Sequence, residues 1–289
     1  MRLYSTDEGI AREDVEGTLA VLDLPYTGLI DLLEGPGLEA ARIARPLREV
    51  PLEHTGLRPL LSRPGKFLTV GLNYPSHAQE ALEKFASISR HDVQLPTEPN
   101  VQIAAGSAVT GQHQPIVLPE IAADHVDFEG EIAVVIGRSV KDISTHAEAW
   151  ACVAGLTVLN DVTARDIQRR AYAGDPVASI GVAKSFDTFK PLGPCLVSAD
   201  EFAQPLDLRL RTWVNGELRQ DDRSRSFLYS VPELICYLSR YQTLEPGDVI
   251  ATGSPRGAGQ FTEQFLRAGD VVSIEVEGIG RLVNPVATA

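Results

Sequence analysis

The 289-residue sequence is poor in cysteine, histidine and basic side chains. Its three cysteines, Cys152, Cys195 and Cys236, lie far apart and form no C-x-x-C pair, which argues against a disulfide framework and a thiolate metal site. Reduced thiols favour a cytoplasmic location. Lysine and arginine number 26 against 39 acidic residues, and the net charge of -13 argues against nucleic acid and anionic membranes as partners.

Long apolar runs and the common nucleotide and zinc motifs are also missing. No stretch approaches the roughly eighteen apolar residues of a membrane span, and the N-terminal MRLYSTDEGIARED has no apolar signal-peptide core. There is no G-x-G-x-x-G after a strand, no Walker loop and no H-E-x-x-H. Ser254 is not in a nucleophile elbow, because Thr252 stands where G-x-S-x-G needs its first glycine. The reactive residue types that remain are mainly carboxylates.

The stretch from Asp127 to Gly137, DFEGEIAVVIG, reads as a strand that becomes apolar on both faces. Alternation places Asp127, Glu129 and Glu131 on one face, with neighbours about 6–7 Å apart along the backbone. Leaving two close carboxylates charged and dry would be costly, and a hard divalent cation resolves that conflict. Oxygen ligands favour Mg²⁺, Mn²⁺ or Ca²⁺ over zinc. The alternative is a sheet edge whose acidic face points to water.

Three further segments carry candidate reactive side chains. PSHAQEALEKF has helical spacing, so His77 and Glu80 are neighbours on one face, as a general base or a water-activating dyad requires. The alternative is a surface pair, and the polar residues that follow predict a lid over 75–100, ordered only with substrate bound. Asp161 ends the apolar strand GLTVLND, and strand ends often open onto clefts. Lys184 lies in a Gly/Ser-flanked segment before a strand broken by proline.

The rest of the pattern is rich in strands. LDLRLRTWVNGELRQ alternates and turns at Asn215-Gly216, which is a strong hairpin signal. Residues 1–64 read as a small N-terminal α/β region, and residues 65–289 as the main body. Most strands fall in the second half, with few crossover helices between them. This predicts an α+β, β-rich fold with a mixed, largely antiparallel sheet rather than a doubly wound parallel one.

In their order along the chain, these blocks resemble the fumarylacetoacetate hydrolase family. GLNYPSHAQE looks like its G-x-N-Y-x-x-H-x-x-E, DFEGEIAVVIG like its E-x-E metal strand, and LNDVTARDIQ like its third-ligand segment. AKSFDTFKPLGP, VNGELRQ and LEPGDVIATGSPRGAG match further blocks. The resemblance runs from Lys66 to Val286.

The resemblance implies a site and an assembly. It places the metal ligands, for Mg²⁺ or alternatively Mn²⁺ or Ca²⁺, on Glu129, Glu131 and Asp161. It places the catalytic groups on Lys184 and on a lid dyad of His77 and Glu80, and the substrate-binding groups on Arg165, Gln168, Thr252, Gly253 and Ser254. For Arg165 and Gln168 the alternative is a hydrogen-bond network at a helix N-terminus. The family fold is a β-roll catalytic domain behind a smaller N-terminal region, usually in a homodimer, and its substrates are small 2-oxo acids and β-dicarbonyl compounds.

The family's reactions share the negative charge that builds on an enolate oxygen, which a divalent cation stabilises as a Lewis acid. We expect a metal-dependent hydrolase that cleaves a C–C bond in a 2,4-dioxo acid or acylpyruvate-like compound, with His77 and Glu80 activating water. The alternatives are a keto–enol isomerase or decarboxylase of 2-oxo acids, or a catalytically degenerate member. Gln102 and Ala104 stand where many members have Phe and Lys, which argues for a substrate larger or less anionic than oxaloacetate.

Overall fold

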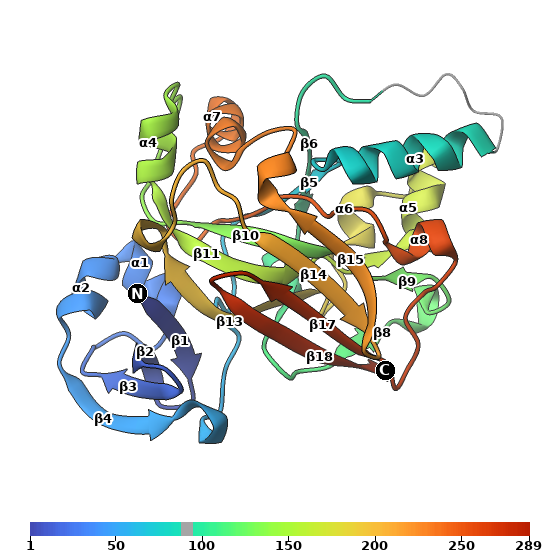
Figure 1. The fold of residues 1–289 in the computed structure, drawn as a ribbon. Helices are drawn as coiled ribbons and strands as arrows, with labels where there is room; N and C mark the ends of the chain where they lie inside the picture. The colour runs from blue at the N-terminus through green and yellow to red at the C-terminus, as the bar shows by residue number, and fades with distance from the viewer. Residues whose placement is uncertain (88–94) are drawn as a thin grey trace.

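The computed structural model describes residues 1–87 and 95–289, which form three β-sheets with short helices at their margins (Figure 1). The predicted lid over residues 75–100 falls in part on residues 88–94, which lie outside the described residues. The α-helices are α1 (Leu29–Glu34), α2 (Leu38–Ile43), α3 (Pro75–Ser87), α4 (His146–Ala151), α5 (Arg165–Tyr172), α6 (Ile180–Ala183), α7 (Val231–Tyr241) and α8 (Gly259–Thr262). The 3₁₀ turns are η1 (Leu52–His54), η2 (Gly106–Ala108), η3 (Glu120–Ala122), η4 (Ala199–Glu201) and η5 (Ser224–Ser226). In this part of the chain, no helix is both long enough and apolar enough to cross a membrane.

The largest sheet has the strand order β4-β3-β2-β1-β13-β11-β10-β16-β5-β6, and β7 pairs with β13 beside this path. Its strands are β1 (Arg2–Thr6), β2 (Gly9–Val15), β3 (Thr18–Leu22), β4 (Pro46–Pro51), β5 (Phe67–Gly71), β6 (Asn100–Ala104), β7 (Val109–Thr110), β10 (Gly130–Ile136), β11 (Val153–Asn160), β13 (Lys190–Ser198) and β16 (Val249–Ala251). Only β16 with β5 and β13 with β7 pair in parallel among the described residues of this sheet. Strand β1 hydrogen-bonds to β13, so residues 1–64 continue the main sheet, and the division of the chain after residue 64 stays a prediction.

A second sheet has the order β15-β14-β17-β18-β8, and a small third sheet pairs β12 with β9. The strands are β8 (Ile116–Leu118), β9 (Val126–Asp127), β12 (Thr163–Ala164), β14 (Arg209–Val214), β15 (Glu217–Arg223), β17 (Val271–Val276) and β18 (Gly280–Thr288). The predicted hairpin is present, because β14 and β15 pair across Asn215 and Gly216, whose φ angles are 53° and 80°. The predicted β-rich, mixed and largely antiparallel fold is confirmed.

The two large sheets pack face to face, and Figure 1 shows β14, β17 and β18 lying across β10 and β11. Ile132 and Val134 of β10 contribute to the apolar cluster that contains Ile274 of β17. The alternate residue Ala133 belongs to a second apolar cluster, which contains Leu32 of α1 on the opposite face. Strand β10 is therefore buried on both faces, as its continuous apolar run predicted.

The prediction that most strands fall in the second half is wrong. Within the described residues, ten of the eighteen strands, β1 to β10, end by Ile136. The N-terminal region contributes the antiparallel series β1 to β4. Short strands such as β7 and β9 contain two residues each, which is too few to leave an alternating pattern in the sequence.

Gly130 lies where β10 approaches the second sheet. A Cβ added at Gly130 would collide with Thr212 Oγ1 of β14 and would lie 3.2 Å from Gln220 Oε1 of β15. The Gly130 N–H donates to that same Gln220 oxygen at 2.9 Å. The Thr212 hydroxyl is itself buried and has no hydrogen-bond partner among the described residues. Glycine at 130 thus allows the close approach of the sheets between two acidic neighbours.

We predict that Gly130→Ala lowers the free energy of unfolding by about 1–3 kcal/mol, as overpacking of a tight contact does. Thr212→Ala removes the oxygen that collides with the new Cβ. The loss in free energy of unfolding of the double variant should therefore be smaller than the sum of the losses of the two single variants. Gly28→Ala is the matched control, because a Cβ at Gly28 meets nothing within 4 Å. Urea unfolding of the four variants measures the coupling, and strict additivity would contradict this description of the contact.

Candidate metal centre and active site

Glu129 and Glu131 lie at the start of β10 with their side chains on one face, as strand alternation predicted. They are only 6% and 2% exposed, so the alternative of a solvated acidic edge is excluded. Asp161 follows β11, and its N–H donates to the Glu129 carbonyl at 2.8 Å. Ligand oxygens of the three residues all lie within 4.8 Å of one another. The structure therefore brings the three predicted ligands together.

Lys184 joins two of these carboxylates. It follows α6, and its Nζ donates to Glu129 Oε2 at 2.8 Å, to Asp161 Oδ2 at 2.6 Å and to Thr163 Oγ1 at 3.0 Å. Burial alone would lower the pKa of Lys184, but the charges of Asp161 and Glu129 outweigh burial and raise it. Lys184 is thus a fixed cation at the centre of the cluster.

Arg165 holds Glu129 from another side. It begins α5, and its Nη2 donates to Glu129 Oε1 at 2.7 Å, its Nε to Asp127 Oδ2 at 2.8 Å and its Nη1 to Gln168 Oε1 at 2.8 Å. Asp127 also accepts the Gly259 N–H at 2.7 Å. These contacts are a hydrogen-bond network at a helix N-terminus, and substrate binding by Arg165 and Gln168 stays a prediction.

Glu129 and Glu131 differ sharply in how their charge is compensated. Burial would raise the pKa of Glu129, but Arg165 and the nearby ammonium bring it below its usual range. For Glu131, burial raises the pKa well above its usual range, and the charges of Asp161 and Glu129 raise it further. Among the described residues, only the Gly253 N–H donates a hydrogen bond to Glu131, at 2.7 Å. Glu131 is therefore the carboxylate whose charge most needs a cation.

The donor set and charge of this cluster fit a divalent cation. Within this cluster of described residues, four buried acidic side chains face three buried basic ones: Asp127, Glu129, Glu131 and Asp161 against Arg165, Lys184 and Lys190. A buried excess of negative charge is unfavourable unless a further positive charge compensates it. The three clustered ligands offer oxygen only, which is the donor set of Mg²⁺, Mn²⁺ and Ca²⁺.

His77 and Glu80 lie on one face of α3, both buried, so the alternative of a surface pair is excluded. His77 Nδ1 is 3.5 Å from Glu80 Oε2 and has no hydrogen-bond partner among the described residues. Both Glu80 oxygens accept the Gly257 N–H, at 3.2 and 3.1 Å. The His77 ring packs edge-on against Phe261, with centroids 5.4 Å apart. Burial raises the pKa of Glu129, whereas the charges of Arg165, Lys184 and, to a smaller extent, His77 lower it. The His77 ring therefore lies close enough to Glu129 to interact with its charge.

Gly253 brings the loop after β16 against Glu131. Its φ of +94° lies in the region that favours glycine, and an added Cβ would lie 2.8 Å from Asn73 Cβ. Asn73 fixes this loop, because its Nδ2 donates to the Thr252 carbonyl at 2.8 Å. The backbone N–H that faces Glu131 is therefore held in place from both sides.

The two hydroxyl groups of this loop already have partners. Thr252 Oγ1 donates to the Ile132 carbonyl at 2.8 Å, and Ser254 Oγ accepts from Gln220 Nε2 at 2.8 Å. The structure thus places residues 252–254 beside the cluster, while substrate binding by them stays a prediction.

Sequence reasoning missed Lys190, the first residue of β13. Its side chain is fully buried, and its Nζ lies 2.8 Å from Asp161 Oδ1. A signal was present, because a lysine inside the apolar run FKPLGPCLV must find partners if that strand is buried.

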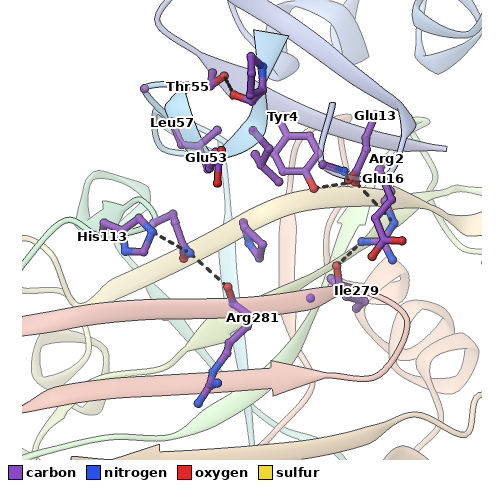
Figure 2. Close-up of a pocket in the computed structure, with 17 residues that line it drawn as sticks. Arg2, Tyr4, Glu13, Glu16, Glu53, Thr55, Leu57, His113, Ile279 and Arg281 are labelled. Carbon is purple, nitrogen blue, oxygen red and sulfur yellow. Dashed lines mark hydrogen bonds and ion pairs between the residues drawn. The ribbon is translucent and has the colours of Figure 1, made fainter. Parts of the chain in front are cut away.

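Figure 2 shows a cavity of about 1200 Å³ in a different part of the molecule, between the N-terminal strands and β18. Arg2, Tyr4, His113 and Arg281 are among the residues that line it, and none of the predicted site residues does. Large cavities are common ligand sites. Glu13, Glu16 and Glu53 line this one, but among the described residues only Glu129, Glu131 and Asp161 form an acidic group close enough to hold a metal ion. We place the chemistry at the buried carboxylates, where the charges converge.

Comparison with known proteins identifies the family of the chain. The family model described as fumarylacetoacetate (FAA) hydrolase C-terminal matches residues 66–287. Oxaloacetate tautomerase FAHD2B, mitochondrial, of Bos taurus is 40% identical over 236 residues, which cover 81% of this chain and 70% of that protein.

Solved structures give the same result over the whole chain. The 5-carboxymethyl-2-hydroxymuconate delta-isomerase of Mycobacterium smegmatis is 33% identical, with a TM-score of 0.76 and coverage of 100% of both chains. The maleylpyruvate hydrolase of Sphingobium sp. SYK-6, in complex with manganese (II) ion and pyruvate, is 26% identical, with a TM-score of 0.77 and the same coverage. The chain is therefore an enzyme that belongs to the fumarylacetoacetate hydrolase family.

Proposed function

We propose that this enzyme is a divalent-metal-dependent keto–enol tautomerase of a small 2-oxo acid. The observation that carries the proposal is the buried cluster of Glu129, Glu131 and Asp161 around the Lys184 ammonium. These three carboxylates would hold Mg²⁺ or Mn²⁺, with Ca²⁺ as the alternative. The bound ion would supply a Lewis acid for the negative charge that develops on the substrate's oxygen atoms.

The cations of the chain would share in stabilising that charge. Lys184 is already fixed by two carboxylates and a hydroxyl, so it needs little reorganisation to face a developing oxyanion. Arg165 acts through Glu129, which it keeps ionised and oriented. The groups proposed to border the substrate are Gln168, Thr252, Gly253 and Ser254.

His77 is the proposed proton carrier. Its Nδ1 is buried without a hydrogen-bond partner among the described residues, so the imidazole can accept or release a proton there. Glu80 Oε2 lies 3.5 Å from that nitrogen. In the enol-to-keto direction, His77 would deliver a proton to the carbon next to the 2-oxo group while the enol hydroxyl loses its proton; in the reverse direction it would take the proton from that carbon while the oxygen gains one. General acid–base catalysis of this kind is typically worth about 10²–10⁴-fold in rate.

Tautomerisation ranks above hydrolysis for two reasons. His77 Nδ1 lies 3.5 Å from Glu80 Oε2 and has no hydrogen-bond partner among the described residues, so the two are not closely hydrogen-bonded as a water-activating dyad would be. Relatives at 40% and 33% identity are named as a tautomerase and an isomerase, whereas two solved structures named as hydrolases are 30% and 26% identical. Cleavage of a C–C bond in an acylpyruvate-like compound is the second candidate, because both residues that could activate water, His77 and Glu80, are present although their geometry is loose. The convergence of all the proposed groups disfavours the alternative of a degenerate member.

Alanine at position 104 is compatible with oxaloacetate as a substrate. Ala104 is 5% exposed and belongs to the same apolar cluster as Ala133 and Phe67. Its small side chain is therefore explained by packing in the sheet, without reference to the size or charge of a substrate. We propose that small dicarboxylic 2-oxo acids such as oxaloacetate are among the compounds to test first.

A homodimer is proposed from the family resemblance. The edge strand β6 exposes Ile103 at 63%, and the adjacent helix α6 exposes Val182 at 55%, which leaves apolar surface for a partner subunit. Light scattering should give twice the chain mass of 31.3 kDa; a monomer mass at micromolar concentration would contradict the dimer. The cytoplasmic location stays a prediction, since a relative is named as mitochondrial.

We predict that the wild type binds one Mn²⁺ or Mg²⁺ per chain and that Glu131→Gln weakens this binding by about tenfold or more. Glutamine keeps the length of the side chain and can still accept the Gly253 N–H, so the change isolates the charge. Glu49→Gln, on exposed strand β4, is the control and should bind the ion as the wild type does. Titration calorimetry measures all three, and equal affinities throughout would refute the assignment of Glu131.

We predict that the purified protein with Mg²⁺ accelerates the enol-to-keto conversion of oxaloacetate and that His77→Ala slows it by about 10²–10⁴-fold. His54→Ala is the control, because the His54 side chain is 73% exposed and should not affect the rate. The decay of enol absorbance measures the reaction. In parallel, acylpyruvates are incubated in H₂¹⁸O. Cleavage that places ¹⁸O in a product carboxylate, without any effect on oxaloacetate, would establish hydrolysis instead.

A further inference from the structure

The ammonium of Lys190 lies in a cradle of oxygen atoms. Its Nζ donates to the main-chain carbonyls of Lys184, Phe189 at 3.1 Å and Val162 at 3.4 Å, and lies 2.8 Å from Asp161 Oδ1. The side chain is 0% exposed. Main-chain carbonyls and a carboxylate are also the ligands that proteins use to hold hard metal cations. Lys190 therefore fills a site with the chemistry of a cation-binding site.

The cradle connects two parts of the proposed active centre. Val162 directly follows Asp161, and the Lys184 carbonyl belongs to the residue whose ammonium bridges Asp161 and Glu129. The two oxygens of Asp161 therefore face different lysines, with Oδ2 on Lys184 and Oδ1 on Lys190. A change at Lys190 would free one side of the Asp161 carboxylate and loosen the main chain that carries Lys184.

We propose that Lys190 is a positioning residue, a built-in monovalent cation that fixes Asp161 and Lys184 for binding of the divalent ion. Truncation to alanine would leave a cradle of three carbonyls and one carboxylate, which ammonium or potassium can fill. The part that concerns the divalent ion rests on the proposed metal site, whereas the cradle itself does not.

The test compares Lys190→Ala with the wild type in buffers whose only monovalent cation is tetramethylammonium, which is too large for the cradle. The variant should bind Mn²⁺ about tenfold or more weakly, as loss of an outer partner of a metal ligand typically causes. Ammonium or potassium chloride at about 100 mM should restore part of the Mn²⁺ affinity of Lys190→Ala and raise its melting temperature. Neither salt should have these effects on the wild type. Lys66→Ala is the matched control, because Lys66 Nζ also pairs with a buried carboxylate, Asp248 Oδ2, at 2.7 Å. Asp248 lies before β16, whereas Gly253, which contacts Glu131, follows that strand. This control should keep its Mn²⁺ affinity and show no specific response to either cation.

The possible results test separately the cradle around Lys190 and its effect on binding of the divalent ion. Wild-type Mn²⁺ affinity in Lys190→Ala, or weakened affinity that neither cation restores, would overturn the proposal. If the wild type binds no Mn²⁺, the proposed metal site fails, and the melting temperatures still test the cradle. If Lys190→Ala does not fold, Lys190→Gln is measured in its place, because its amide keeps two N–H donors without the charge. Lys190→Gln should also lose Mn²⁺ affinity, and unchanged affinity would overturn the proposal.

Discussion

Four carboxylates buried next to one another form the constraint on which the rest of the site depends. Each must meet a cation or an N–H donor, because an uncompensated buried charge is strongly unfavourable. Arg165 donates hydrogen bonds to Asp127 and Glu129, and Lys184 donates them to Glu129 and Asp161. Among the described residues, Glu131 receives a hydrogen bond from a single backbone N–H, that of Gly253. The surplus charge is therefore concentrated at one position, which is where a divalent ion would bring the largest gain.

The sheets hold this unfavourable arrangement in place. Strand β10 is packed on both faces, so its two glutamates cannot turn away to water. Gly130 lets the second sheet approach between them, and its N–H is satisfied by Gln220. The groups proposed to handle protons, His77 and Glu80, come from helix α3 instead. The fold thus separates a rigid charged centre from the acid–base pair, which lies on a helix outside the sheet.

The sequence predicted those parts of the site that follow from local spacing. Alternation placed Glu129 and Glu131 together, and helical spacing did the same for His77 and Glu80. It could not supply the contact between Lys190 and Asp161, which depends on how β11 and β13 pair. It also overestimated the share of strands in the second half, because two-residue strands have no detectable period. The residue types of the site could be read from the sequence, whereas the contacts that depend on pairing between distant strands could not.

We propose that the surplus negative charge around Glu131 binds one divalent ion. The most direct measurement is anomalous diffraction from crystals soaked with Mn²⁺ and pyruvate. We expect a single strong anomalous peak bounded by carboxylate oxygens of Glu129, Glu131 and Asp161. Manganese bound only at other positions, with no peak at these carboxylates, would contradict a divalent-ion site at Glu131.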